Sequence, residues 1–136
     1  SPLGTMIETP RAALIAGDLA PLVDFMSFGT NDLTQMTYGF SRDDVEASVI
    51  KKYIEMDILQ KSPFAQLDAL GVGKLVQEAI NSSRVANPEI KIGICGEHGG
   101  DPTSIRFLAN SGVNYVSCSP PRIPIARLVC AQETLK

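Results

Sequence analysis

Short apolar runs that alternate with segments of helical period are the feature that most limits the fold of this sequence. The runs cover residues 5–7, 25–28, 90–94 and 115–118, and a helix-forming segment follows each of them. This alternation is typical of βα units, which assemble a parallel sheet. Four such units form either half of a (β/α)8 barrel or a small doubly wound sheet, and the length of 136 residues fits both.

Capping residues predict where the first helices begin and end. Thr9 and Pro10 suit the N-cap and the first position of a helix, and Pro21 is expected to end it. Residues 30–32 are expected to form a polar turn whose side chains cap the next helix. Residues 39–69 show no periodicity, so we predict a loop with short helices there.

The second half of the chain carries clearer helix signals. One apolar face with helical spacing is formed by Val72, Leu75, Val76, Ala79 and Ile80. Asp101 and Pro102 are expected to start the following helix, Gly112 to adopt a left-handed conformation after it, and Pro124 to open the last helix.

Composition favours a single soluble globular domain. The net charge is -3 and no block of like charges occurs, which gives no support for a nucleic-acid or membrane-surface patch. No run approaches the roughly 20 apolar residues that cross a bilayer. The three cysteines show no paired spacing, so we expect a reducing compartment: the cytoplasm, or an organelle such as a plastid or glycosome.

Polar residues gather directly after the predicted strands, where parallel strands share one end of a sheet. Glu8 follows the first strand and Asp32 the second. Two neighbouring carboxylates suit Mg²⁺, which fills the rest of its octahedron with substrate oxygens and water. The alternative is that Glu8 is a solvated turn residue and Asp32 an N-cap, which is the commoner role of an acidic residue at a helix start.

Two further groups could carry chemistry. Residues 29–31 precede a helix and could offer backbone N–H groups and an amide to an anion, or form an ordinary βα turn. Cys95 could act as an acid, base or nucleophile at a cleft, or be a small buried hydrophobe. We expect Cys118 and Cys130 to be buried, in a strand and a helix respectively.

Other motifs give little support to rival functions. His98 and Cys95 form one close pair, short of the two that a structural zinc site usually has, so we expect a hydrogen-bonded loop histidine. The segment 71–74 lacks the residues of a phosphate-binding loop, and Lys74 is expected on a solvated helix face. Neither a nucleophile elbow nor a dinucleotide fingerprint occurs.

Three segments, in order, resemble the phosphoenolpyruvate-utilising enzyme family. They are residues 4–13 (GTMIETPRAA), 27–35 (SFGTNDLTQ) and 93–100 (GICGEHGG). Residues 36–44 and 115–120 are closer to the dikinase branch of that family than to the synthase or sugar-phosphotransferase branches. The resemblance covers nearly the whole chain and implies that residues 1–136 are the C-terminal half of a (β/α)8 barrel that binds phosphoenolpyruvate and pyruvate.

The resemblance also implies roles for individual residues. Glu8 and Asp32 are expected to ligate Mg²⁺, and Cys95 to donate the proton that turns the enolate into pyruvate. The residues expected to contact the substrate are Glu8, Gly29, Thr30, Asn31 and Asp32. The dikinase branch interconverts ATP, phosphate and pyruvate with AMP, diphosphate and phosphoenolpyruvate, and the synthase branch uses water in place of phosphate.

Several parts of such an enzyme are absent from these 136 residues. The resemblance places the phosphohistidine, the ATP-binding domain and the phosphate-binding arginines elsewhere, so Arg122 is not assigned to that role. We therefore expect the isolated chain to be inactive and the whole enzyme to form a homodimer through its barrel. The alternative is that the chain serves only as an oligomerisation fragment.

Overall fold

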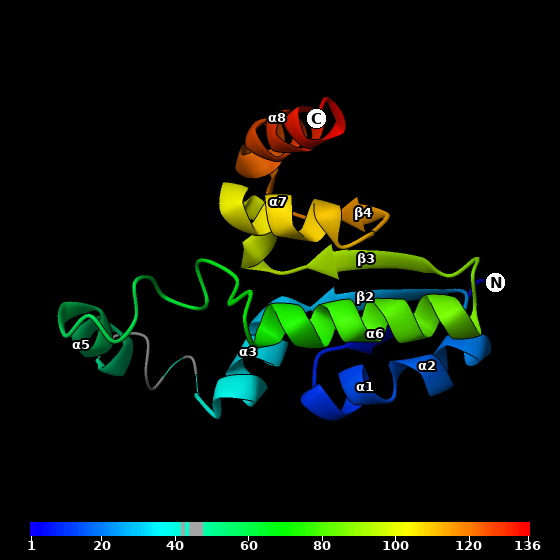
Figure 1. The fold of residues 1–136 in the computed structure, drawn as a ribbon, viewed down its shortest axis with the longest axis horizontal. Helices are drawn as coiled ribbons and strands as arrows, with labels where there is room; N and C mark the ends of the chain where they lie inside the picture. The colour runs from blue at the N-terminus through cyan, green and yellow to red at the C-terminus, as the bar shows by residue number, and fades with distance from the viewer. Residues whose placement is uncertain (42, 44–47) are drawn as a thin grey trace.

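The computed structural model describes residues 1–41, 43 and 48–136, and its four strands form one parallel sheet in the order β1-β2-β3-β4 (Figure 1). The strands are β1 Gly4–Ile7, β2 Phe25–Gly29, β3 Lys91–Cys95 and β4 Tyr115–Val116. The α-helices are α1 Pro10–Leu14, α2 Ala16–Leu19, α3 Thr30–Tyr38, α5 Val49–Glu55, α6 Val72–Ala86, α7 Pro102–Asn110 and α8 Ile123–Thr134. Short 3-10 helices are η1 Ala20–Leu22, η2 Glu97–Gly100 and η3 Pro120–Arg122.

The strand order decides between the two predicted architectures. A doubly wound sheet reverses its strand order at a switch point and carries helices on both faces. Here each strand pairs with the next one along the chain. Sequential parallel pairing with connecting helices is the arrangement of a (β/α)8 barrel, so the chain is an α/β fold that forms half of such a barrel.

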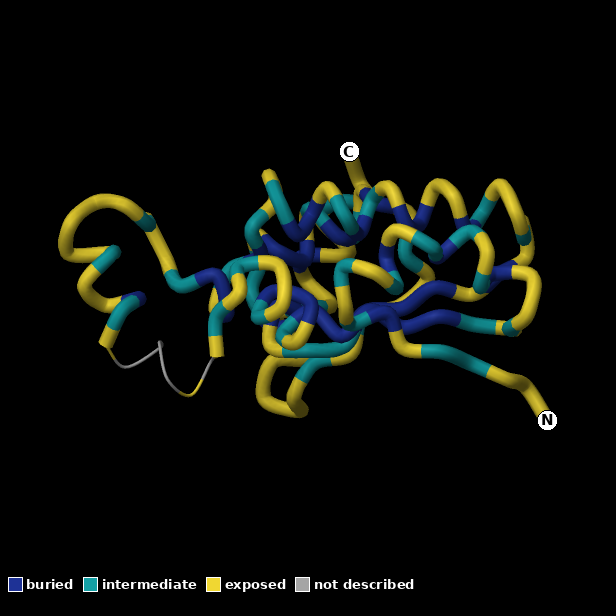
Figure 2. Tube along the Cα trace, turned by 90° about the horizontal axis from the view of Figure 1, so that it is seen from below, coloured by how far each residue is buried: buried dark blue, intermediate teal, exposed yellow. Residues whose placement is uncertain are grey.

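The hydrophobic core lies between the sheet and α1, α2 and α6. Alternate strand residues, among them Ile7, Phe28 and Ile94, are fully buried there and meet the apolar face of α6 around Val76. In Figure 2 the buried residues of the strands appear as dark blue stretches of the chain. Full burial of each large aliphatic or aromatic side chain contributes about 1.5–3 kcal/mol.

The opposite face of the sheet is open. Met6, Ser27, Gly93 and Tyr115 stand in one register row across the four strands. The ring of Tyr115 lies over Gly93, where a Cβ would meet its atoms at 2.0 Å. Met6 and Tyr115 remain 44% and 43% exposed. In a closed barrel this face points inward, so these side chains are left without their packing partners.

Most predicted helix boundaries are confirmed. The Thr9 side chain accepts a hydrogen bond from the Ala12 N–H at 3.2 Å, and Asp101 accepts one from Ser104 at 2.8 Å. The predicted apolar face belongs to α6, with Lys74 exposed on its other side. Pro124 lies in the first turn of α8, and Gly112 follows α7 with a φ of 87°.

Three predictions about local structure are wrong. The first helix breaks at Ile15 into α1 and α2, and the chain passes Pro21 in a 3-10 turn rather than ending there. Residues 30–32 are the first turn of α3 and not a capping turn, because Gly29 holds the N-cap position. The fourth strand ends at Val116, two residues early.

The predicted burial of two cysteines is also wrong. Cys118 lies beyond the end of β4 and is only partly buried, because the strand ends before it. Cys130 is exposed on α8, which carries further exposed apolar residues such as Leu128.

The long connection between α3 and α6 is mainly irregular and contains α5, as predicted. Phe64 and Leu67 anchor its second part in the protein interior. Part of the motif at 36–44, including Arg42, lies outside the described residues. Over the parts of the chain that the structure describes, no helix has the length and apolar character needed to span a membrane.

Candidate functional site

The ends of β1, β2 and β3 bring three of the predicted site residues into one row. Gly29 pairs with Cys95, and Ile7 pairs with Phe28, so Glu8 follows β1 beside Gly29. Strands lie about 4.8 Å apart, which puts the backbones of Glu8 and Cys95 roughly 10 Å apart with Gly29 between them. The row stands on the open face of the sheet, since side chains alternate between faces.

Gly29 provides the space that the Glu8 side chain uses. A Cβ on Gly29 would lie 2.9 Å from both Cβ and Oε2 of Glu8, and 3.4 Å from the Met6 methyl group. Any larger residue at Gly29 would displace the carboxylate. Because Gly29, in the centre of the row, has no side chain, the Glu8 side chain can lie over it.

The first turn of α3 holds the other predicted substrate residues. Thr30 is fully buried, Asn31 is partly buried and Asp32 is exposed. Gly29 has no side chain to cap the helix, so the first N–H groups of this nine-residue helix lack a side-chain cap. These groups and the helix dipole favour a negative charge at this point.

The Cys95 thiol is held by two polar neighbours on β2. Its sulfur lies 3.6 Å from the Ser27 hydroxyl, which donates to it, and 3.5 Å from the Phe28 carbonyl oxygen, which accepts the thiol proton. Cys95 is partly buried and so is not the wholly buried small hydrophobe of the alternative interpretation, while a catalytic role for its thiol stays a prediction. Ser27 was not predicted as a site residue, although it is the first residue of the motif at 27–35.

His98 is hydrogen-bonded, as predicted, and its side chain is also buried. Its Nδ1 lies 2.7 Å from Thr30 Oγ1 and its Nε2 lies 2.7 Å from the Pro63 carbonyl oxygen. Within the described residues, no three His, Cys, Asp or Glu side chains gather as a metal-binding group. Both ring nitrogens of His98 have hydrogen-bond partners within the protein.

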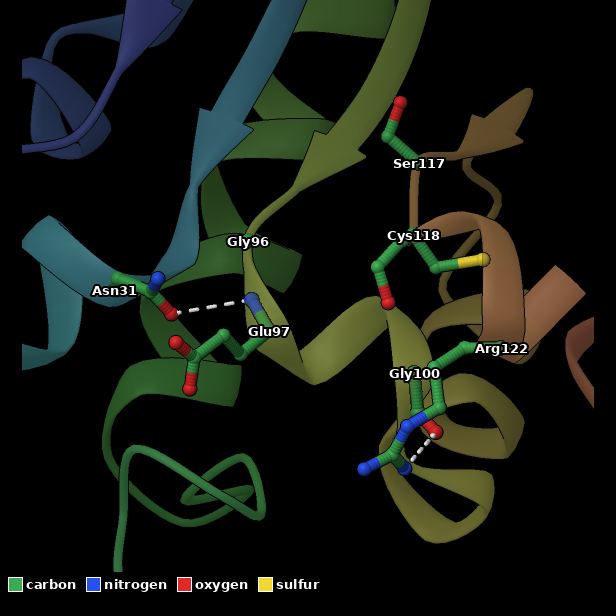
Figure 3. Close-up of a pocket in the computed structure, with 8 residues that line it drawn as sticks. Asn31, Gly96, Glu97, Gly100, Ser117, Cys118 and Arg122 are labelled. Carbon is green, nitrogen blue, oxygen red and sulfur yellow. Dashed lines mark hydrogen bonds between the residues drawn. The ribbon is translucent and has the colours of Figure 1, made fainter.

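A cavity of about 560 Å³ opens beside the strand-end row (Figure 3). Its lining consists of Asn31, Gly96, Glu97, Gly100, Ser117, Cys118, Ser119 and Arg122. Asn31 Oδ1 accepts a hydrogen bond from the Glu97 N–H at 3.2 Å, which joins α3 to the turn after β3. Of the predicted site residues, only Asn31 lines this cavity. Glu8, Gly29 and Cys95 belong to the neighbouring row.

The sequence interpretation missed the residues that follow β4. Ser117, Cys118 and Arg122 enter the cavity because β4 ends at Val116 and the chain then turns across the end of the sheet. Arg122 Nη1 donates to the Gly100 carbonyl oxygen at 3.1 Å. The rule that strand ends share one face could have found them, had the fourth strand not been predicted two residues too long.

Comparison with known proteins identifies the family to which the chain belongs. The profile described as "PEP-utilising enzyme, PEP-binding domain" matches residues 1–135. The chain belongs to the phosphoenolpyruvate-utilising enzyme family. Its membership agrees with the half-barrel architecture and with the resemblance seen in the sequence.

Curated relatives of the chain include plant proteins. Pyruvate, phosphate dikinase 2 of Oryza sativa subsp. japonica is 57% identical over 133 residues, which cover 98% of the chain and 15% of that protein. Pyruvate, phosphate dikinase 1, chloroplastic, of Arabidopsis thaliana is 58% identical over 130 residues, covering 96% of the chain and 13% of that protein. The Zea mays pyruvate, phosphate dikinase 2 is 58% identical over 130 residues, 96% of the chain and 15% of that protein. The chain thus spans about one seventh of these relatives.

Proposed function

We propose that this chain is the C-terminal part of the barrel domain of a pyruvate, phosphate dikinase and carries the residues that bind and protonate the pyruvate enolate. The whole enzyme, a phosphotransferase, interconverts ATP, phosphate and pyruvate with AMP, diphosphate and phosphoenolpyruvate. The observation that carries the proposal is the row of Glu8, Gly29 and Cys95 on the open sheet face. In this row the carboxylate of Glu8 and the thiol of Cys95 stand at the ends of the two strands that flank Gly29.

Glu8 and Asp32 are the proposed ligands of Mg²⁺. Both supply hard carboxylate oxygens, and Gly29, which has no side chain, leaves the space in which the Glu8 carboxylate lies on the open face of the sheet. Asp32 is exposed in the first turn of α3 and free of any side-chain capping role. The chemistry supplied by Mg²⁺, when bound, is neutralisation of the negative charge on the enolate oxygen.

Cys95 is the proposed proton donor. As the S–H bond breaks, a C–H bond forms at the methylene carbon of the enolate and pyruvate results, while the reverse direction removes that proton. The Ser27 hydroxyl, which donates to the sulfur, stabilises the thiolate left behind, because a hydrogen bond to the charged form favours that form. Asn31 and the N–H groups at the start of α3 hold the anionic end of the substrate.

The remaining machinery is proposed to lie outside this chain. It comprises the ATP-binding domain, the phosphohistidine domain and the arginines that bind phosphate and carboxylate. The isolated chain is therefore expected to be inactive, and the whole enzyme to be a cytoplasmic or organellar homodimer. Because the relatives described above carry dikinase names, a synthase that uses water is the weaker alternative.

A titration tests the binding part of the proposal on the chain itself. Oxalate is a planar mimic of the enolate. Added together with Mg²⁺, it should shift the backbone NMR signals of Glu8, Asp32 and Cys95, whereas oxalate alone should shift them less. A matched Glu8→Gln variant should lose the Mg²⁺-dependent part of the response. Absence of any shift at millimolar ligand would favour a scaffold without a site.

The catalytic part is tested in a full-length dikinase in which residues 1–136 replace the matched segment of the Arabidopsis relative. Cys95→Ala should abolish pyruvate formation and spare phosphoryl exchange between nucleotide and histidine, because that exchange needs no enolate proton. Cys130→Ala, at an exposed position on α8, is the control and should change neither. Pyruvate formation that survives Cys95→Ala would remove Cys95 from its role.

A non-catalytic oligomerisation role is the second candidate, and the open sheet face favours it. The exposed Met6 and Tyr115, together with the unpaired outer edges of β1 and β4, can associate with another half barrel. Sedimentation of the chain distinguishes the outcomes. A well-folded monomer at high concentration would contradict this candidate.

A further inference from the structure

His98 joins three segments that meet beneath the candidate site. The ring is fully buried, with Nδ1 2.7 Å from Thr30 Oγ1 at the start of α3 and Nε2 2.7 Å from the Pro63 carbonyl oxygen. Pro63 belongs to the long connection, and His98 itself follows Cys95 by three residues. One imidazole therefore links the segment directly after Cys95 to the helix that carries Asp32 and to the loop between α5 and α6.

The chemistry of the partners favours one arrangement of the hydrogens on the ring nitrogens. A carbonyl oxygen only accepts, so Nε2 must carry a proton and donate it to Pro63. In the neutral ring Nδ1 then accepts, and the Thr30 hydroxyl donates to it. The Thr30 hydroxyl can also donate to the Cys95 carbonyl oxygen at 3.2 Å, and its contact with Nδ1 is the shorter of the two.

The Thr30 side chain therefore lies between His98 Nδ1 and the Cys95 carbonyl oxygen. Its role is to fix the start of α3 against the turn after β3. Gly96 permits this contact, because a Cβ there would lie 2.5 Å from Thr30 Oγ1 and its φ of +124° is strained for other residues. The hydrogen bond from the Glu97 N–H to Asn31 Oδ1 is a second contact that joins the same two segments.

We propose that His98 is a positioning residue that sets the distance between the Cys95 thiol and the groups of α3 that face the substrate. Its Nδ1 contact with Thr30 carries that function, and its Nε2 contact attaches the loop at Pro63. The catalytic consequence rests on the function proposed above. A displacement of about 1 Å between reacting groups can cost on the order of 100-fold in rate, so one hydrogen bond can matter here.

Two amide substitutions separate the two contacts. His98→Asn places an amide oxygen near the Nδ1 position, and His98→Gln reaches the Nε2 position. In the full-length dikinase that carries this chain, the readout is the exchange of pyruvate methyl protons with deuterated water. His98→Asn should stay close to the parent. His98→Gln and Thr30→Val should each lower kcat for exchange roughly 10- to 100-fold with little change in KM.

The double variant tests whether both residues act through one bond. His98→Gln combined with Thr30→Val should exchange no more slowly than either single variant, because the same contact is lost. Phosphoryl exchange between nucleotide and histidine should be unchanged throughout. The proposal would be overturned if His98→Asn and His98→Gln lowered kcat for exchange equally and in proportion to their loss of thermal stability. That result would show that His98 has only a structural role.

A measurement that needs no catalysis separates this proposal from the proposed function. His98 is the single histidine of the sequence, so ¹⁵N-labelled imidazole in the 136-residue chain reports on one ring. A protonated Nε2 and an unprotonated Nδ1 that responds to Thr30→Val are expected. A protonated Nδ1, or no response, would overturn the assignment. If the parent enzyme showed no methyl exchange but the chain gave the expected ring signals, the proposed function would be wrong. The hydrogen-bond assignment of His98 would still be supported.

Discussion

Glu8 and Gly29 are in such close contact that a single added carbon on Gly29 would lie 2.9 Å from both Cβ and Oε2 of Glu8. The two residues are adjacent across β1 and β2 at the carboxyl end of the sheet. The proposed metal ligand is thus positioned by a residue that has no side chain. Chemistry at Glu8 should be sensitive to changes on the neighbouring strand.

Gly29→Ala should weaken the Mg²⁺-dependent binding of oxalate and lower the free energy of unfolding by about 1–3 kcal/mol, because the added methyl group overpacks the site. Calorimetric titration and urea unfolding measure the two effects. Gly17→Ala on α2, whose Cβ would meet its nearest atom at 3.2 Å, is the control and should leave oxalate binding unchanged. Unaltered binding in Gly29→Ala would show that Glu8 does not depend on this space.

Thr34→Val should raise the free energy of unfolding by about 1 kcal/mol. Thr34 on α3 is fully buried, and among the described residues its hydroxyl has no hydrogen-bond partner. Replacing a buried unpaired hydroxyl by a methyl group of similar size removes its desolvation cost. Thr37→Val in the same helix is the comparison, since the Thr37 hydroxyl donates to the Leu33 carbonyl oxygen at 2.7 Å. Destabilisation by Thr34→Val would indicate a partner for that hydroxyl.

Ser104→Ala should destabilise the chain more than a typical loss at a helix start. The Ser104 hydroxyl donates to Asp101 at 2.6 Å and accepts from the buried Leu67 N–H at 2.8 Å. Its removal leaves that N–H unpaired in the interior, at a cost of about 1–3 kcal/mol. Hydrogen exchange should then show faster opening around Leu67. An unchanged exchange rate there would mean that Ser104 does not anchor the loop.

The stability of the chain should fall as the pH rises from 10 to about 12. Burial, and then the charge of Asp68 and a hydrogen bond with it, raise the pKa of Tyr38 from 10.0 to about 12. In this window the unfolded chain releases the phenolic proton while the folded chain keeps it, so unfolding becomes more favourable as the pH increases. Asp68→Asn should lower the pKa of Tyr38 only in part, because burial is the largest cause.

Spectrophotometric titration of tyrosinate measures that pKa. Tyr38→Phe is the control and should remove both the late titration step and its share of the pH dependence. A Tyr38 that titrates near 10 in the folded chain would contradict the prediction.

Local patterns were sufficient to predict the strands and most helix starts. The strand residues Ile92 and Ile94 and the cap residues Thr9 and Asp101 act through neighbours within a few positions, so their roles are visible in the sequence. Local patterns alone left the choice between a half barrel and a doubly wound sheet open, whereas the family resemblance predicted the half barrel and the strand order confirms it. That choice depends on the order in which strands pair, and strands of either architecture have the same apolar character.

The contacts of the candidate site could be predicted only in part. His98 lies 68 residues from Thr30 and 35 from Pro63, and no local pattern links positions so far apart. Thr30 was expected in a capping turn, but its hydroxyl is used by His98 and Gly29 occupies the cap position. The family resemblance pointed to the row of Glu8, Gly29 and Cys95, whereas the cavity residues Ser117 and Arg122 became evident only once the end of β4 was known.

The sequential strand order has a consequence for how the chain reaches its structure. Gly4 pairs with Phe25 and Gly93 with Tyr115 across short stretches of chain, whereas Phe25 pairs with Lys91 across a stretch about three times as long. Closing a longer loop costs more chain entropy, and distant pairings slow folding. The two outer strand pairs can therefore form early and independently, and the junction between β2 and β3, where Gly29 meets Cys95, is completed last.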